Sequence, residues 1–252
     1  MTQSTVLPEA EPMSHVGTSS IGVLVLHGFT GNPSSMRSIA EAMVAADHHV
    51  ELPRLPGHGT VIEDMIPTGW ADWTAEVRAA HGRLTARVDR IVAVGLSMGG
   101  SLTLWAGLEL DRIVGLVCIN PATRPHDDEV VEMVTELVAD GVEIAPAIGG
   151  DIADPDVTES SYDGAPLRAL LSFTNDGLAP LADRYGELQL PLLLITSRQD
   201  HVVEPGQSEH LAATYGGDVD HVWLERSFHV ATQDYDRDDI VARTLAFVER
   251  IA

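Results

Sequence analysis

The sequence contains no lysine and a single cysteine, and each scarcity excludes a class of chemistry. Without a lysine amine, the chain cannot form a Schiff base with a carbonyl substrate or use lysine as a nucleophile. With Cys118 alone, no disulfide can form within the chain, and its place in the apolar run 113–119 predicts a small core side chain. This cysteine usage favours a reducing compartment, so we expect a cytoplasmic protein.

Positive charge is also scarce. The 15 basic residues, all arginine, face 38 acidic ones, and the formal net charge is -23. Because phosphate contacts need a basic surface, we expect no nucleic-acid partner. No apolar run approaches the roughly 18 residues of a membrane helix. We therefore expect no integral membrane segment. The first twenty residues also lack the basic start and apolar stretch of a signal peptide.

Hydrophobic residues make up 44% of the 252 residues, enough for one folded domain with a full core. After a lead-in over 1–19 that we expect to be loose, strand-length apolar runs alternate with stretches of helical periodicity. The expected strands are 21–26, 49–53, 91–96, 113–119, 192–196 and 221–224. The expected helices include 70–88, 97–110, 205–215 and 236–250. This alternation predicts an α/β fold with a mostly parallel sheet and helices on both faces.

The alternation stops at Pro121 and resumes near residue 190. Residues 130–138 form an amphipathic helical pattern with an acidic side, and 141–164 are rich in Gly, Pro and Asp, which is typical of loop. No buried strand is expected in this stretch. We predict a core formed by residues 1–120 and 190–252, with residues 121–189 inserted as a cap or lid.

The hexapeptide GLSMGG at 95–100 is the clearest chemical signal. It matches G-x-S-x-G between an expected strand and an expected helix, where a nucleophilic serine occupies a sharp turn. Side chains two residues before and after the serine would collide, which explains Gly95 and Gly99. We predict Ser97 as the nucleophile; the alternative is a glycine-rich turn before an ordinary helix.

A serine nucleophile needs a base, and the base needs a carboxylate that orients it. Where a nucleophilic serine lies in such a strand–turn–helix, the acid and the histidine both come later in the chain, with the acid first. His229 lies in a loop after the last strand, and Asp200 follows a buried strand, at the carboxyl end of the sheet, where binding sites of parallel sheets collect. We predict these two as base and acid. The alternatives are His201, His210 and His221 for the base and Asp218, Asp220 and Asp234 for the acid.

Two backbone N–H groups are expected to bind the oxyanion. One belongs to Met98, the residue after the nucleophile, and the other to Phe29, in the loop after the first buried strand. His27, in the same loop, is expected to brace it. We expect His48 and His49 at the surface, and His58 in a tight loop near the site. No set of side chains has metal-ligand spacing, and no phosphate-binding loop is present.

Five segments together resemble the α/β-hydrolase superfamily, and within it bacterial monoacylglycerol lipases and small carboxylesterases. These segments are 27–33, 53–59, 95–100, 197–203 and 227–234. The resemblance implies ester hydrolysis through an acyl-serine, no cofactor, and a mobile apolar cap. Carried over by position, it implies a triad of Ser97, Asp200 and His229, with Phe29 and Met98 as oxyanion donors.

Segments 149–152 and 157–162 resemble cap loops of the monoacylglycerol lipases. In those relatives a cap glutamate binds the glycerol hydroxyls, and Glu159 matches that position; the alternative is an exposed glutamate in a polar loop. By the same match, Ile148 would line the acyl channel. Exposed apolar cap residues would suit a lipid aggregate or a second subunit equally, which leaves open a homodimer through the cap.

These observations predict a serine esterase that hydrolyses carboxylic esters, with monoacylglycerols as the expected substrates. Two kinds of alternative remain. The chain could be another serine hydrolase, such as a broad short-chain carboxylesterase, a thioesterase or a peptidase. It could also be a non-catalytic ligand-binding member of the fold, although a receptor need not retain nucleophile, base and acid.

Overall fold

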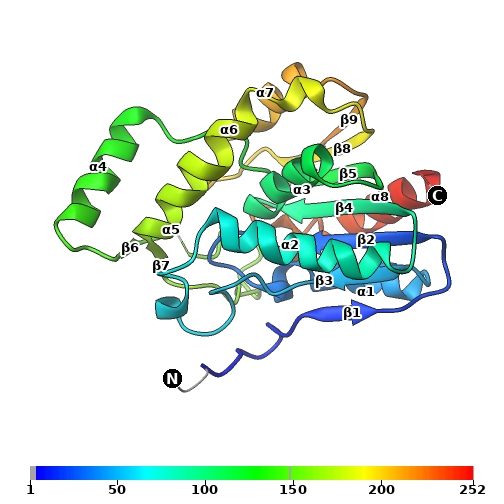
Figure 1. The fold of residues 1–252 in the computed structure, drawn as a ribbon, viewed down its shortest axis with the longest axis horizontal. Coiled ribbons are helices and arrows are strands. Elements are labelled where there is room, and N and C mark those ends of the chain that lie inside the picture. Colours follow the sequence, from blue (N-terminus) through cyan, green and yellow to red (C-terminus); the bar gives the residue numbers. More distant parts are fainter. Residues whose placement is uncertain (1–3, 148, 252) are drawn as a thin grey trace.

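The computed structural model describes residues 4–147 and 149–251. Its main sheet has seven strands in the order β1-β3-β2-β4-β5-β8-β9. Every neighbouring pair is parallel except β1 with β3. The strands are β1 (Met13–His15), β2 (Ile21–Leu26), β3 (His49–Leu52), β4 (Arg90–Leu96), β5 (Ile113–Ile119), β8 (Leu192–Ser197) and β9 (Val219–Leu224). The prediction of a mostly parallel α/β sheet is confirmed (Figure 1).

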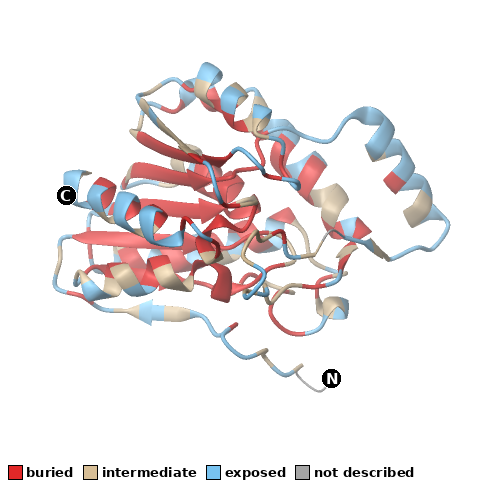
Figure 2. Ribbon diagram, turned by 180° about the vertical axis from the view of Figure 1, so that it is seen from behind, coloured by how far each residue is buried: buried red, intermediate tan, exposed pale blue. Residues whose placement is uncertain are grey.

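The central strands are buried because helices cover both faces of the sheet (Figure 2). Along β2, Leu24 and Leu26 belong to one apolar cluster, and Val23 and Val25 to the other, as the two-residue repeat of a strand requires. The first cluster includes side chains of α2 (Trp70–Thr85), α3 (Met98–Glu109) and α7 (Gly206–Thr214). The second includes those of α1 (Arg37–Ala45) and α8 (Arg237–Ile251). Each large side chain buried in this way contributes about 1.5–3 kcal/mol.

The lead-in is more ordered than the sequence predicts. β1 pairs antiparallel with β3, and the Ser14 hydroxyl donates a hydrogen bond to the buried carboxylate of Glu51. Only 5% of His48 and 8% of His49 is exposed, so the prediction of surface histidines is wrong. The reason is that the lead-in crosses this edge of the sheet, where Ser19 Oγ lies 2.8 Å from His48 Nδ1. A three-residue strand is too short to show periodicity in a sequence.

The first part of the chain between β5 and β8 lies beyond the carboxyl ends of the parallel strands, and its last part returns alongside the sheet (Figure 1). It contains α4 (Asp128–Ala139), α5 (Leu167–Ser172), a π-helical stretch (Phe173–Leu178), α6 (Ala179–Ala182) and a short 3-10 turn (Tyr185–Glu187). It also contains β6 (Ile144–Pro146) and β7 (Gly164–Pro166), an antiparallel pair in a stretch where the sequence predicts only loop. These two strands are again too short to be recognised from a repeat.

Three further 3-10 helices are short. Pro33–Met36 precedes α1, Ile62–Asp64 precedes α2, and Ala231–Gln233 precedes α8. At the start of the first, the Asn32 side chain accepts a hydrogen bond from Ser34 N–H and proline occupies the first turn, a typical helix start. In the described part of the chain, no helix is both long enough and apolar enough to cross a membrane.

Candidate active site

Ser97 occupies the sharp turn between β4 and α3, with φ 57° and ψ -122°. Glycine is required on both sides of this turn. A Cβ on Gly95 would lie 2.0 Å from the Gly99 oxygen, and one on Gly99 would lie 2.2 Å from the Leu26 oxygen. A non-glycine residue in this conformation stores about 1–3 kcal/mol of strain, which the surrounding sheet and helix must offset. The turn places the serine on the wall of a cavity.

His229 lines the same cavity and is 94% buried, since 6% of it is exposed. Its Nδ1 lies 2.7 Å from Asp200 Oδ2. The other carboxylate oxygen of Asp200 accepts hydrogen bonds from the N–H groups of Val202 (2.9 Å) and Val203 (2.8 Å). Because a carboxylate only accepts, Nδ1 carries the proton and Nε2 is the basic nitrogen.

The other candidate acids and bases lie elsewhere. His201 pairs with Asp151, His221 contacts the Thr196 hydroxyl, and His210 lies on α7. Asp234 binds backbone N–H groups, and Asp220 faces Arg250, 3.9 Å away. The carbonyl of Asp218 accepts a hydrogen bond from Leu192 N–H, at the opposite end of the parallel strands. Of the predicted site residues, the structure therefore brings together Ser97, His229 and Asp200.

Phe29 and Met98, the two predicted oxyanion donors, lie in the segments next to Ser97. Met98 is the first residue of α3, and Phe29 lines the cavity. A Cβ on Gly28 would lie 3.3 Å from Ser97 Cβ, so the loop after β2 passes close to the nucleophile. Among the hydrogen bonds of the described residues, neither N–H has a protein acceptor. Both are free to bind an oxyanion.

His27 supports this loop from below. Its Nε2 accepts a hydrogen bond from Leu55 N–H (3.1 Å), and its Nδ1 donates one to the Gly28 carbonyl (3.0 Å). Burial lowers the pKa of His27 well below its usual value, and the neighbouring His58 ring lowers it further. The neutral imidazole thus acts as a brace, in agreement with the role that the sequence predicts.

The cavity has a volume of about 410 Å³. Apolar side chains on its wall include Phe29, Leu96, Leu170 and Val202. Glu159 also lines it, packed so closely that a Cβ on Gly31 would lie 3.3 Å from its Oε1. Burial raises the pKa of Glu159, and the nearby His229 and a hydrogen bond from Ser161 oppose that rise. Ile148, the other predicted cap contact, lies outside the described residues.

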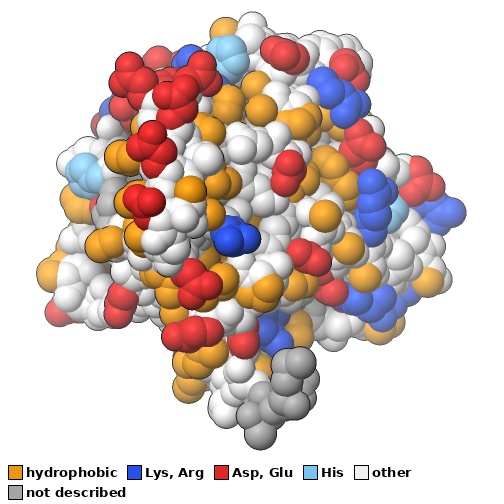
Figure 3. All heavy atoms as spheres, turned by 60° about the vertical axis from the view of Figure 1, so that its left-hand side comes forward, with side chains coloured by type: hydrophobic (Ala, Val, Ile, Leu, Met, Phe, Trp, Pro, Cys, Tyr) orange, Lys and Arg blue, Asp and Glu red, His pale blue; other side chains and the backbone are white. Residues whose placement is uncertain are grey.

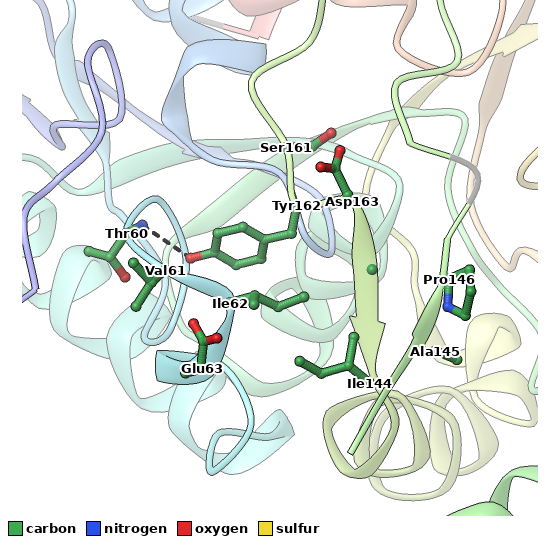
Figure 4. A pocket seen from close by; sticks show the side chains of 11 residues that line it. Thr60, Val61, Ile62, Glu63, Ile144, Ala145, Pro146, Ser161, Tyr162 and Asp163 are labelled. Carbon is green, nitrogen blue, oxygen red and sulfur yellow. Dashed lines mark hydrogen bonds between the residues drawn. The ribbon is translucent and has the colours of Figure 1, made fainter. Parts of the chain in front are cut away.

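A second and larger cavity, of about 640 Å³, lies on the other side of the β6–β7 pair. Figure 4 shows Tyr162 crossing it toward Thr60, whose N–H donates a hydrogen bond to the tyrosine hydroxyl. That hydroxyl donates in turn to the Gly57 carbonyl. Neither Ser97 nor His229 lines this space, so size alone does not identify the reactive cavity. Among the described residues, no cluster of three His, Cys, Asp or Glu side chains could hold a metal ion.

Three polar residues that the sequence analysis did not assign to the site support the loop of His229. Asn120, at the end of β5, accepts a hydrogen bond from Ser197 N–H (2.7 Å) and donates one to the His229 carbonyl (2.8 Å). Ser197 Oγ donates to the Phe228 carbonyl (2.8 Å), and Asp151 accepts from His229 N–H (3.0 Å). Asn120 and Ser197 each come directly after an expected buried strand, and this position could have indicated that they lie near the site.

The serine elbow, the histidine–carboxylate pair and the parallel sheet define the class of protein. A family model described as the alpha/beta hydrolase family matches residues 23–243, and the chain belongs to this family. It is 38% identical to a thermostable monoacylglycerol lipase of Bacillus sp. (strain H-257) over 254 residues, covering 99% of this chain and 98% of the relative. It is 25% identical to a carboxylesterase of Bacillus subtilis (strain 168), covering 91% and 92% of the two chains.

Solved structures agree with this assignment. A structure from a study of LipS and LipT, two metagenome-derived lipolytic enzymes, superposes with a TM-score of 0.90 at 40% identity, over 98% of this chain and 100% of that one. The monoacylglycerol lipase of Paleococcus ferrophilus superposes with a TM-score of 0.82 at 15% identity, over 96% and 99%, and this likeness concerns the fold alone. The predicted resemblance to bacterial monoacylglycerol lipases and carboxylesterases is confirmed.

Proposed function

We propose that this chain is a carboxylic ester hydrolase that cleaves monoacylglycerols to a fatty acid and glycerol through an acyl-Ser97 intermediate. One observation carries the proposal. A single cavity of about 410 Å³ is lined by Ser97, by His229 with Asp200 behind it, and by the half-buried Glu159. The chain thus combines a reactive serine with a polar group that can bind an alcohol.

The chemistry follows from the placement of these groups. Nε2 of His229 takes the proton as Ser97 Oγ attacks the ester carbonyl, while Asp200 keeps the proton on Nδ1 and stabilises the imidazolium. The N–H groups of Phe29 and Met98 bind the oxyanion, and each such donor stabilises a transition state by roughly 2.7–4 kcal/mol. His229 then protonates the departing glycerol oxygen. Water deacylates the serine by the reverse route.

Preference for a monoacylglycerol would come from the two sides of the cavity. The apolar wall at Leu170 and Val202 suits an acyl chain. Glu159 can accept hydrogen bonds from two vicinal hydroxyls, which a 1-monoacylglycerol has and a diacylglycerol or an ethyl ester lacks. Residues 121–189 would act as the cap that covers this cavity, with residues 1–120 and 190–252 as the catalytic core.

A broad carboxylesterase is the second candidate. The mostly apolar wall around Ser97 favours it, because such a wall selects an acyl chain without selecting the alcohol. In that case Glu159 would be a half-buried carboxylate that does not bind the leaving alcohol. A thioesterase would use the same serine, histidine and aspartate.

The decisive experiment compares kcat/KM for a medium-chain monoacylglycerol with that for the diacylglycerol and the ethyl ester of the same acid. We expect the monoacylglycerol to be preferred. We also expect Ser97→Ala to lose activity by a factor on the order of 10⁶. Equal rates on the monoacylglycerol and ethyl ester would favour the broad carboxylesterase. A Ser97→Ala protein that keeps most of its rate would contradict the mechanism.

Location and assembly belong to the same proposal. The one cysteine, Cys118, is a buried free thiol, and this cysteine usage favours a reducing compartment and hence a cytoplasmic enzyme. The outer face of α4 exposes Val130 and Met133, and we propose it as the contact for a homodimer. Light scattering across a range of concentrations tests this: Met133→Glu should shift a dimer to monomer, and a wild-type chain that stays monomeric contradicts it.

A further inference from the structure

Asp151 is a buried carboxylate that the proposed chemistry does not use. It lies in the segment between β6 and β7, and 8% of it is exposed. Its partners are distant in sequence: Oδ2 accepts a hydrogen bond from His229 N–H (3.0 Å) and one from His201 N–H (3.1 Å). Oδ1 lies 2.8 Å from His201 Nδ1. One carboxylate group therefore contacts the loops that carry both the base and its acid.

The backbone of Asp151 makes the connection tighter. Its carbonyl oxygen accepts a hydrogen bond from Val230 N–H (3.0 Å), so side chain and backbone bind consecutive residues of the base loop. His201 follows Asp200 directly, and its ring packs edge-on against Phe228, with the ring centroids 4.5 Å apart. The acid loop and the base loop thus meet at Asp151 on one side and at the Asp200–His229 hydrogen bond on the other.

A buried carboxylate costs several kcal/mol of desolvation unless donors surround it. Two backbone N–H groups and one imidazole fill this requirement at Asp151, and charge-assisted hydrogen bonds of this kind are shorter and stronger than neutral ones. Neither backbone donor can rotate to find another partner. Replacing the carboxylate would therefore leave His229 N–H unpaired in a buried place and free the loop to shift.

We propose that Asp151 is a positioning residue, which fixes the backbone of His229 relative to Asp200 so that the imidazole faces Ser97. The inference rests on the proposed function, because it assumes that His229 is the base. It also assigns a task to the segment between β6 and β7. The same segment that presents Glu159 to the cavity aligns the reacting histidine.

Asp234 provides a matched comparison. Its carboxylate binds N–H groups of the same two segments, Ala153 and Asp154 on one side and Phe228 on the other, without contacting His229. Loss of Asp234 therefore loosens the attachment between the segments and leaves the histidine contact in place. Asp156, an exposed carboxylate nearby, serves as a control for charge alone.

The experiment measures three quantities for Asp151→Asn, Asp151→Ala, Asp234→Asn and Asp156→Asn. They are kcat and KM on a soluble p-nitrophenyl ester, the rate at which a fluorophosphonate labels Ser97, and the melting temperature. For Asp151→Ala we expect kcat and the labelling rate to fall about 10- to 100-fold with KM within twofold, the size expected for a misplaced catalytic group. Asp151→Asn, which keeps one acceptor oxygen, should fall about tenfold, and Asp156→Asn should not change.

Asp234→Asn should lower the melting temperature at least as much as Asp151→Asn while keeping kcat within threefold. Equal losses of kcat in the two variants at equal melting temperature would overturn the proposal, since Asp151 would then act only on stability. If Asp151→Ala does not fold, Asp151→Asn tests the proposal instead. In that variant the downfield resonance of the His229 Nδ1 proton should shift, because a displaced imidazole changes its hydrogen bond to Asp200. An unchanged resonance and kcat overturn it.

Failure of the proposed function gives a different pattern. A wild-type chain that labels at Ser97 and cleaves the p-nitrophenyl ester but ignores monoacylglycerols contradicts the substrate, and the test of Asp151 is unaffected. A wild-type chain that neither labels nor cleaves overturns the proposed function and this inference together.

Discussion

The loop that carries His229 and the helix α4 differ in how much of each is buried. In the loop over residues 225–236, successive backbone groups are hydrogen-bonded to side chains. Ser227 N–H donates to Asp236 and Phe228 N–H to Asp234 within the loop, and the His229 carbonyl accepts from Asn120, in a distant segment. In α4, among the described residues only Val134 is buried. Figure 3 shows acidic and apolar side chains exposed side by side on the face that includes α4.

The difference corresponds to what each region must do under the proposed function. A base has to be within hydrogen-bond reach of its nucleophile, and a displacement of about 1 Å can cost roughly 100-fold in rate. A cap element only has to admit and cover a substrate, so few contacts suffice and exposure is tolerated. Density of buried hydrogen bonds therefore marks the part of the structure on which the chemistry depends.

Substituting Asn120 should have the largest effect on the loop that carries His229. In Asn120→Ala, the His229 carbonyl and Ser197 N–H both lose their partner in a buried place, at about 1–3 kcal/mol for each unsatisfied group. We expect kcat to fall about 100-fold with KM little changed. Steady-state kinetics and urea unfolding measure both effects. Asn175→Ala, at an exposed position, is the control, and an equal loss there would contradict the assignment.

Asp236 should matter for stability more than for rate. Burial tends to raise its pKa, but hydrogen bonds from Arg226 and Ser227 outweigh burial, so the pKa is lower than usual. A carboxylate with a lowered pKa stabilises the fold at neutral pH, and this contribution disappears as pH falls through the folded-state pKa. Asp236→Asn should cost about 1–3 kcal/mol at pH 7.

Urea unfolding at pH 7 and in steps below pH 4 checks this prediction. The difference between wild type and Asp236→Asn should shrink as the solution becomes more acidic. Asp183→Asn, at an exposed position, should show no such difference. If the difference in the free energy of unfolding between wild type and Asp236→Asn does not change with pH, the charge of the carboxylate does not stabilise the loop.

Glu159 lines the same cavity as His229, and its substitution should give a smaller, pH-dependent effect. Because its pKa is raised, it should become protonated at a higher pH than an ordinary glutamate. The preference for monoacylglycerol over ethyl ester should then decline as pH falls, with both rates measured on the same enzyme. Glu159→Gln should remove this decline, whereas Glu63→Gln, in the larger cavity, should keep it. A pH-independent ratio in wild type would remove Glu159 from alcohol recognition.

The smallest effect is expected on α4. Met133 has 54% of its surface exposed, so Met133→Ser should change the free energy of unfolding by less than about 0.5 kcal/mol. The rate on a soluble short-chain ester should also be unchanged. A loss above 1 kcal/mol in a dilute monomeric sample would show that α4 packs against the rest of the chain more closely than its exposure indicates.

Local patterns determined much of this protein. The apolar runs that became β2, β4, β5 and β8 could be predicted because a strand covered on both faces has no polar positions. Ser97 could be predicted because the strained turn requires glycine at 95 and 99, and that requirement is written within five residues. The order of elements also indicated His229 and Asp200 as the base and acid that we propose.

Only the tertiary structure decided the rest. β1, β6 and β7 each span three residues, and each forms against a partner supplied by a distant segment. Asn120, Asp151 and Asp234 are ordinary polar residues in the sequence, and their significance lies in hydrogen bonds that reach 50 to 109 positions along the chain. A periodic pattern or a strained turn is a local property of the chain. The partner of a buried carboxylate is not, because it exists only once the loops have been brought together.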